Sequence, residues 1–223
     1  MIENIKYKIK KTIIGIYILK IKFFLNFGLE KEAKYLKKNF KFTNSADIGS
    51  NAGYYSNMLT KISNKVFSFE PIKYHCINQK KIFKKMNVKI LNLGLGNKRD
   101  KKRLFIPRNN DPEASFINKS KNFASTFVNL ERGDYIFGNK KIDFIKIDVE
   151  GYELDVLRGL KSQIQNFKPL LLIEIEKRHN KNYFKVFKFL NNYNYNIYYL
   201  TEKNRLEEIP IKLIDRFFKN RQK

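Results

Sequence analysis

The sequence contains few of the residues that form covalent or metal-linked frameworks. Of its 223 residues, one is cysteine (Cys76), two are histidine and none is tryptophan. A single cysteine excludes a disulfide within the chain and a metal site built from several cysteines. Two histidines are too few for a histidine-rich zinc site, and His75, on a helix expected after Pro71, is interpreted as a surface residue. We therefore expect no metal site, and the lone cysteine is consistent with a reducing, cytoplasmic compartment.

Acidic residues are also scarce. The chain has 46 Lys and Arg residues against 21 Asp and Glu residues, which gives a formal net charge of +25 at pH 7. Such a balance is typical of proteins that bind nucleic acids or anionic membranes. The excess is spread along the whole chain, however, and accompanies abundant Asn, Ile, Phe and Tyr, the residues of A/T-rich codons. We favour this compositional explanation and keep a polyanion-binding site as the alternative.

Long apolar runs are missing from the N-terminal part as well. Its longest apolar stretch, residues 13–19, is bracketed by lysines and is shorter than the roughly 20 residues needed to span a bilayer. No small-residue cleavage site follows it, which argues against a signal peptide. The stretch predicts a helix that packs on the domain, and the alternative is a basic amphipathic helix at the inner face of an anionic membrane.

No linker or repeat divides the chain, so we predict a single domain that is preceded by an N-terminal segment. Residues 1–44 form a basic helical segment, in which a second helix over residues 29–40 could cover a ligand pocket. Residues 45–223 form one domain, and 43% hydrophobic composition is enough for a proper core.

The most informative glycines lie in the stretch DIGSNAG, residues 47–53. A short strand is expected before it and a helix over residues 54–62 after it. Gly49 and Gly53 allow a tight turn and the close approach of a ligand, and the helix N-terminus favours an anionic group. A second strand ends about 20 residues later in Glu70, where an acid typically hydrogen-bonds ribose hydroxyls. This order predicts a nucleoside cofactor at the switch point of a parallel sheet.

The glycine spacing indicates which cofactor. A dinucleotide site requires G-x-G-x-x-G, whereas this loop has Gly49-x-x-x-Gly53 with an acid in front. Asp47 would repel a pyrophosphate but attract ammonium and sulfonium groups, and S-adenosyl-L-methionine carries both as well as a ribose. We predict this cofactor, with a nicotinamide-dependent oxidoreductase as a rival. The predicted contacts are Asp47, Gly49, Asn51, Gly53 and Glu70, with Leu95 in a small-residue turn beneath the adenine.

A charged strand end forms the second informative stretch, IDFIKIDVEG at residues 142–151. Lys146, Asp148 and Glu150 share one face of the expected strand because side chains alternate. Such charges are costly to bury unless they are paired or used, and at the carboxyl end of a parallel strand they face the ligand crevice. Asp148 is the candidate general base or acceptor-orienting group, and Lys146 could pair with it or hold an anion. Glu150 lies at the turn; the alternative for all three is a salt-bridged strand end.

A neighbouring strand is expected over residues 170–176. Glu174 would lie beside Asp148 if the two strands are adjacent, and paired carboxylates raise one pKa in a way that suits base catalysis. Two carboxylates could also bind a divalent cation, but no third ligand is evident. His179 is interpreted as an exposed loop residue. The polar segment 98–129, with short strands near residues 104–106 and 125–130, is expected to shape the substrate mouth.

Four stretches in this order, DIGSNAGYYS, VFSFEP, KIDVEGYELDVLRG and KPLLLIEIE, resemble the FkbM family of S-adenosylmethionine-dependent methyltransferases over residues 30–200. The resemblance implies an α/β, Rossmann-like class I methyltransferase fold, with a mostly parallel central sheet and helices on both faces. It implies O-methylation of a hydroxyl on a sugar, glycan or related metabolite. By matching positions, it implies that the glycine-loop residues and Glu70 bind the cofactor. It also implies that Lys146, Asp148, Glu150 and Glu174 line the acceptor side.

Besides the oxidoreductase rival, three functions follow from the sequence, and the first of them is preferred. The first is methyl transfer to a hydroxyl of a small molecule or glycan. The second is methylation of RNA, which no aromatic-interleaved nucleic-acid motif supports, so we do not expect a nucleic-acid partner. The third is a non-catalytic, polyanion-binding protein of the same fold. The acceptor and the oligomeric state are left open.

Overall fold

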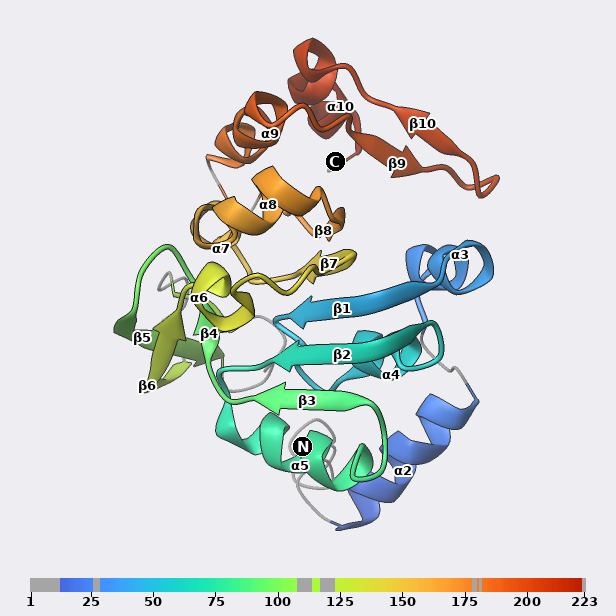
Figure 1. Ribbon diagram of the computed structural model, residues 1–223, viewed down its shortest axis with the longest axis vertical. Helices are drawn as coiled ribbons and strands as arrows, with labels where there is room; N and C mark the ends of the chain where they lie inside the picture. The colour runs from blue at the N-terminus through green and yellow to red at the C-terminus, as the bar shows by residue number, and fades with distance from the viewer. Residues whose placement is uncertain are drawn as a thin grey trace.

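The computed structural model (Figure 1) describes residues 13–25, 29–107, 114–116, 123–177, 180 and 182–221. Its strands are β1 (Phe42–Ile48), β2 (Ser63–Phe69), β3 (Val88–Leu91), β4 (Gly94–Leu95), β5 (Asp100–Pro107), β6 (Phe123–Glu131), β7 (Phe144–Ile147), β8 (Leu170–Ile173), β9 (Tyr198–Leu200) and β10 (Leu206–Glu208). Its helices are α2 (Ile13–Phe24), α3 (Lys31–Asn39), α4 (Tyr54–Leu59), α5 (Lys73–Ile82), α6 (Gly133–Phe137), α7 (Glu153–Gly159), α8 (Lys161–Phe167), α9 (Tyr183–Asn192) and α10 (Ile214–Arg221), with a 3₁₀ turn, η2 (Ile211–Leu213).

A five-stranded sheet with the order β3-β2-β1-β7-β8 forms the centre of the fold, and all its pairings are parallel (Figure 1). The chain runs outward from β1 through β2 to β3, then returns to the other side of β1 and runs outward through β7 to β8. The strand order thus reverses between β1 and β7. In open parallel sheets, ligands bind at the carboxyl ends of the strands at such a switch point. The predicted α/β fold with a mostly parallel sheet is confirmed.

Strand β1 has few large apolar residues, yet its second half is completely buried. Ala46 and Ile48 pack on one face of the sheet, where Phe69 and Leu157 share their core cluster. The alternate residues, Ser45 and Asp47, are polar, and each makes a side-chain hydrogen bond within the protein: the Ser45 hydroxyl lies 2.7 Å from that of Ser63 on β2, and Asp47 accepts from Ser56. The strand is therefore central despite its weak apolar pattern, since hydrogen-bonded polar side chains can be buried at low cost.

Helices cover both faces of the sheet, as predicted. On one face, Ile145 and Ile147 of β7 belong to a core shared with α7, α8 and α9. On the other face, Phe144 belongs to a core shared with α3 and α4, which includes Leu36 and Met58. The N-terminal segment thus contributes α3 to the main core, and β1 itself begins at Phe42.

The third strand is shorter than predicted. The sequence suggests one strand over residues 88–95, but β3 ends at Leu91, and Gly94–Leu95 is a separate strand, β4. At the break, the side chain of Asn92 donates hydrogen bonds to the carbonyl oxygens of Glu70 and Pro71, at 2.9 and 3.0 Å. Strand β4 pairs with β6, which in turn pairs antiparallel with β5, so a three-stranded sheet flanks the carboxyl edge of the main sheet (Figure 1). Strands are confirmed at both predicted places, residues 104–106 and 125–130, but both are longer than predicted.

Helix α2 rests on the domain through its last turn. Phe23 is 4% exposed, and its ring centroid lies 4.9 Å from that of Tyr54 and 5.9 Å from that of Phe83. Within the described ranges, no helix has both the length and the apolar character needed to cross a bilayer. The prediction for His75 was wrong: the residue is 7% exposed, because it lies on the inner side of α5.

Candidate active site

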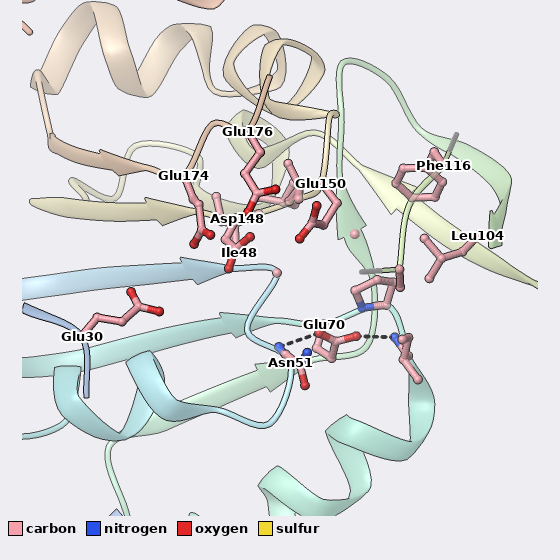
Figure 2. A pocket seen from close by; sticks show the side chains of 17 residues that line it. Glu30, Ile48, Asn51, Glu70, Leu104, Phe116, Asp148, Glu150, Glu174 and Glu176 are labelled. Carbon is pink, nitrogen blue, oxygen red and sulfur yellow. Dashed lines mark hydrogen bonds between the residues drawn. The ribbon is translucent and has the colours of Figure 1, made fainter. Parts of the chain in front are cut away.

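A cavity of about 330 Å³ opens at the carboxyl ends of β1, β2 and β7 (Figure 2). At one end its walls include apolar residues from the adjoining loops and the small sheet, among them Ile72, Leu95, Leu104 and Phe116. The polar side chains of its lining are mostly acidic. Its carboxylates are Glu30, Glu70, Asp148, Glu150, Glu174 and Glu176. No lysine or arginine lies among the lining residues that the structure describes. The cavity therefore combines an apolar end with an unusually negative one.

The glycine loop brings the end of β1 against the end of β7. Gly49 has φ +80°, and a Cβ built there would lie 1.8 Å from the carbonyl oxygen of Asp148. Only glycine fits such a close approach, and it also adopts this backbone conformation without strain. Asn51 follows with φ 48°. Gly49 and Asn51, two of the predicted cofactor contacts, line the cavity.

Glu70 lies at the carboxyl end of β2, at the predicted position of a ribose-binding acid. It is 4% exposed, and its two oxygens accept hydrogen bonds from the backbone N–H groups of Asn51 and Ile72, each at 2.7 Å (Figure 2). Burial raises the pKa of Glu70 to about 7, although the two hydrogen bonds act in the opposite direction. Each carboxylate oxygen keeps a second lone pair, so this rigidly held group can also accept hydrogen bonds from a ligand in the cavity.

Two predicted cofactor residues do not line the cavity. The side chain of Asp47 is fully buried toward α4, where its Oδ2 accepts a 2.7 Å hydrogen bond from the hydroxyl of Ser56. Its Oδ1 has no hydrogen-bond partner among the described residues. Burial raises the pKa of Asp47, and the nearby ammonium of Lys146 limits that rise. Gly53 precedes α4 with φ +91°, and a Cβ there would lie 2.9 Å from the Phe83 ring. In this structure Asp47 and Gly53 support the glycine loop through contacts outside the cavity.

Lys146 and Asp148 form an ion pair on the same face of β7. The ammonium nitrogen of Lys146 lies 2.7 Å from Oδ2 of Asp148 and 4.4 Å from the centroid of the Tyr55 ring. Lys146 is 5% exposed. Burial lowers the pKa of Lys146, but the carboxylates of Asp148 and Asp47 more than offset this effect and raise its pKa above the ordinary value. Lys146 is therefore a charged support behind Asp148, and only Asp148 lines the cavity.

Glu174 lies beside Asp148, as predicted from two adjacent strands. The register pairs Ile147 with Ile173, and the backbone N–H of Glu174 donates to the carbonyl oxygen of Ile147 at 2.9 Å. Both carboxylates line the cavity (Figure 2). Burial is the main cause that raises the pKa of Glu174 to about 7, and the negative charge of Asp148 is the second cause. The pair therefore has one carboxyl that titrates near neutral pH.

The turn after β7 presents Glu150 to the cavity. Glu150 and Gly151 both have positive φ angles, 51° and 100°. The sequence reasoning missed the residue that supports this turn: Glu153 is 1% exposed, and its Oε1 accepts the Gly151 N–H at 2.7 Å. Its Oε2 accepts a 2.7 Å hydrogen bond from the side chain of Asn180. The sequence signal is an acid at the first position of α7, where carboxylates favour contact with free N–H groups.

Two further acids of the cavity were missed, Glu30 and Glu176. Glu30 directly precedes α3, and its Oε2 accepts a 2.7 Å hydrogen bond from the hydroxyl of Tyr55. The predicted helix at residues 29–40 thus contributes to the pocket through its first residues. His179 lies outside the described residues. Within the described residues, no group of three or more His, Cys, Asp or Glu side chains is arranged to hold a metal ion.

The residues that line the cavity fit S-adenosylmethionine. Gly49 has no side chain, so a ligand can approach the backbone of the loop closely. Glu70 can accept hydrogen bonds from two ribose hydroxyls, and the apolar end is suited to an adenine ring. The acidic end complements the ammonium and sulfonium charges of the same molecule. Together with the parallel sheet and its switch point, these features define the class I methyltransferase fold.

Comparison with known proteins gives the family. The model of the methyltransferase FkbM domain matches residues 47–197, about two thirds of the chain. This protein belongs to the FkbM methyltransferase family, which confirms the resemblance seen in the four sequence stretches. No curated protein matches the sequence significantly.

One solved methyltransferase structure shows the same fold, and a second is a more distant match. The methyltransferase FkbM from Methylobacillus flagellatus KT is 15% identical with a TM-score of 0.52, and the match covers 74% of this chain but 42% of that one. An rRNA methylase from Streptococcus thermophilus is 12% identical with a TM-score of 0.44, and the match covers 80% of this chain and 95% of that one. The chain therefore spans less than half the length of the FkbM structure it matches.

Proposed function

We propose that this protein transfers the methyl group of S-adenosylmethionine to a hydroxyl of an uncharged, hydroxyl-rich acceptor such as a sugar or glycan. The observation that supports the acceptor class is the acidic end of the cavity. Five carboxylates gather there: Glu30, Asp148, Glu150, Glu174 and Glu176. Carboxylates accept hydrogen bonds from hydroxyl groups, which sugars present in number. They repel phosphates and other anions.

The cofactor would occupy the side of the cavity next to β2. Glu70 would accept hydrogen bonds from the ribose hydroxyls, because its carboxylate is held in place by two backbone N–H groups. Leu95 and Ile72 would contact the adenine. The sulfonium would then lie near the ends of β1 and β7, between the glycine loop and the acidic end. Asp47 would act from beneath the loop, through the negative charge that it places near the bound cation.

The chemistry requires little beyond alignment and removal of one proton. When bound, S-adenosylmethionine supplies a methyl group that is already activated by the positive sulfur. Asp148 would accept the proton of the attacking hydroxyl, and Lys146 would hold the Asp148 carboxylate in position through the ion pair. Glu174 and Glu150 would bind neighbouring hydroxyls of the acceptor, so that one oxygen is directed at the methyl carbon.

RNA is the weaker candidate for the acceptor. An RNA nucleotide brings phosphates, and the acidic end of the cavity offers five carboxylates and no described cation to receive them. A polyanion could still bind elsewhere on a chain with a net charge of +25. Such binding would weaken steeply with salt and would not depend on Asp148.

The test has two stages. Calorimetric titration with S-adenosylmethionine and with NADH should show binding of the first alone, weakened in Glu70→Ala and nearly unchanged in Asp148→Asn. Transfer of a labelled methyl group is then measured on neutral oligosaccharides, phosphorylated sugars and RNA. Transfer to a neutral hydroxyl acceptor that is lost in Asp148→Asn supports the proposal. Transfer to RNA alone, or loss of cofactor binding in Asp148→Asn, would contradict it.

A further inference from the structure

Helix α2 is apolar around most of its circumference, yet most of its described side chains face solvent. Its sequence is IIGIYILKIKFF, in which the only charged residues are two lysines. Tyr17, Ile18, Ile21 and Leu25, just past its end, are 62%, 43%, 58% and 63% exposed. A helix that is hydrophobic all round is normally buried in a core or in a membrane. The part of the protein that the structure describes does not provide such a core around α2.

The exposed face has a fixed orientation. Phe23 holds the helix against Tyr54 and Phe83, at the start of α4 and just after α5. Tyr17, Ile21 and Leu25 are spaced by four residues and therefore lie along one side of the helix. Because Phe23 points into the domain, the exposed apolar row forms an outward-facing surface at one end of the molecule, beside α5 (Figure 1).

Lysines lie on the same helix as this apolar row and on the segment against which the helix packs. Lys20 and Lys22 are exposed on α2 itself. The neighbouring segment, residues 71–91, contains six lysines and no aspartate or glutamate. Four of these, Lys80, Lys81, Lys84 and Lys85, are exposed on both sides of Phe83, the residue that stacks on Phe23. We call the exposed part of α2 and these four lysines the basic-apolar surface.

We propose that the basic-apolar surface binds the headgroup region of an anionic lipid bilayer. Apolar and aromatic side chains on an interfacial helix insert among the acyl chains, and adjacent lysines are attracted to anionic headgroups. The 12 residues of α2 extend about 18 Å, which is too short to span a hydrocarbon core of about 30 Å. The helix would therefore lie in the plane of the interface.

Other partners fit this surface less well. A second copy of the chain would bring its own lysines to the contact, and like charges facing each other oppose association. A nucleic acid would satisfy the lysines but not the exposed isoleucines. This proposal does not depend on the identity of the methyl acceptor.

The experiment is sedimentation of the full chain with phosphatidylcholine vesicles, with and without phosphatidylglycerol. The wild type should bind the anionic vesicles and bind the neutral ones at least tenfold more weakly. The double variant Tyr17→Glu/Ile21→Glu should lose at least about tenfold in affinity for anionic vesicles. Tyr135→Glu, at a residue of α6 that is 77% exposed, is the matched control and should bind as the wild type does.

A second pair of variants separates this surface from the general charge of the chain. Replacing Lys80, Lys81, Lys84 and Lys85 with Gln should weaken binding roughly tenfold or more. The control replaces four exposed lysines at the opposite end of the molecule, Lys185, Lys188, Lys203 and Lys212, with Gln. The proposal would be overturned by equal losses of vesicle binding in both sets of variants or by absence of binding in the wild type. It would also be overturned if light scattering showed a dimer that the α2 variant dissociates.

Discussion

The cavity and the basic-apolar surface are opposites in charge. Six of the 21 acidic residues of the chain line one cavity, whereas α2 and residues 71–91 contain none. The net charge of +25 thus says little about the site where chemistry would occur. Helix α2 of the basic-apolar surface contacts Tyr54, the residue that directly follows the glycine loop, through Phe23. We therefore expect the cavity to select an uncharged acceptor and the basic-apolar surface to select an anionic membrane.

The largest effect is expected from Asp148→Asn. The amide cannot accept the hydroxyl proton as a carboxylate can, so turnover should fall by at least about a hundredfold. Affinity for S-adenosylmethionine should change little, because the other five carboxylates of the cavity remain. Affinity for anionic vesicles should be unchanged. The measurements are the rate of methyl transfer, calorimetry and vesicle sedimentation. A parallel loss of vesicle binding would show that the two regions are not separate.

A large loss of stability is expected from Gly49→Ala. The new Cβ would lie 1.8 Å from the carbonyl oxygen of Asp148, so the ends of β1 and β7 would have to separate. Gly138→Ala is the matched control, because Gly138 also has a positive φ, +53°, but nothing lies within 4 Å of its Cβ position. We expect a loss of about 1 kcal/mol at Gly138 and about 3 kcal/mol or more at Gly49, measured by denaturant unfolding. Similar losses at both positions would contradict the tight contact.

The affinity for S-adenosylmethionine should fall roughly tenfold or more in Glu70→Ala, because two ribose hydroxyls would lose a buried acceptor. Two backbone N–H groups would also lose their partner, so unfolding is measured alongside calorimetry. Vesicle binding is the internal control: a folded variant should bind vesicles normally. A folded variant with unchanged affinity for the cofactor would remove Glu70 from the ribose.

The pH dependence tests the carboxyl pair. The pKa of Glu174 is raised to about 7, so Glu174 is protonated below that pH and ionised above it. If the ionised pair binds the acceptor and removes its proton, kcat/KM should rise as the pH increases through about 7. Glu174→Gln should flatten this rise between pH 6 and 8. A wild-type profile that is flat across this range, or an identical one in the variant, would exclude Glu174 from this role.

The sequence predicted those features that depend on local residue patterns and on the order of the elements along the chain. The sheet, the switch point, the glycine loop, and Glu70 and Asp148 at strand ends follow from local patterns, and the pairing of Asp148 with Glu174 follows from strand adjacency. The missed features depend on tertiary contacts. Asp47 faces α4 instead of the cavity, because side chains alternate on β1 and Ser56 lies on that side. His75 is buried by packing that no local pattern specifies.

Glu30 is the clearest example of such a tertiary contribution. It lies outside the family match and reaches the cavity only because α3 packs on α4, where Tyr55 donates to its carboxylate. Glu30→Gln keeps an acceptor for Tyr55 but removes one negative charge from the acidic end. We expect KM for a neutral hydroxyl acceptor to rise only a few-fold, since one hydrogen bond to a charged group is weakened. Affinity for S-adenosylmethionine should change little.

The same variant bears on the charge of the acceptor. If the acidic end excludes anions, Glu30→Gln should improve kcat/KM for a phosphorylated analogue of the acceptor relative to the neutral one. Asp215→Asn, at an acid of α10 that does not line the cavity, serves as the control and should leave the ratio unchanged. An unaltered ratio in Glu30→Gln would mean that the cavity selects its acceptor by shape, and that the charge contrast between the two regions has no part in selection.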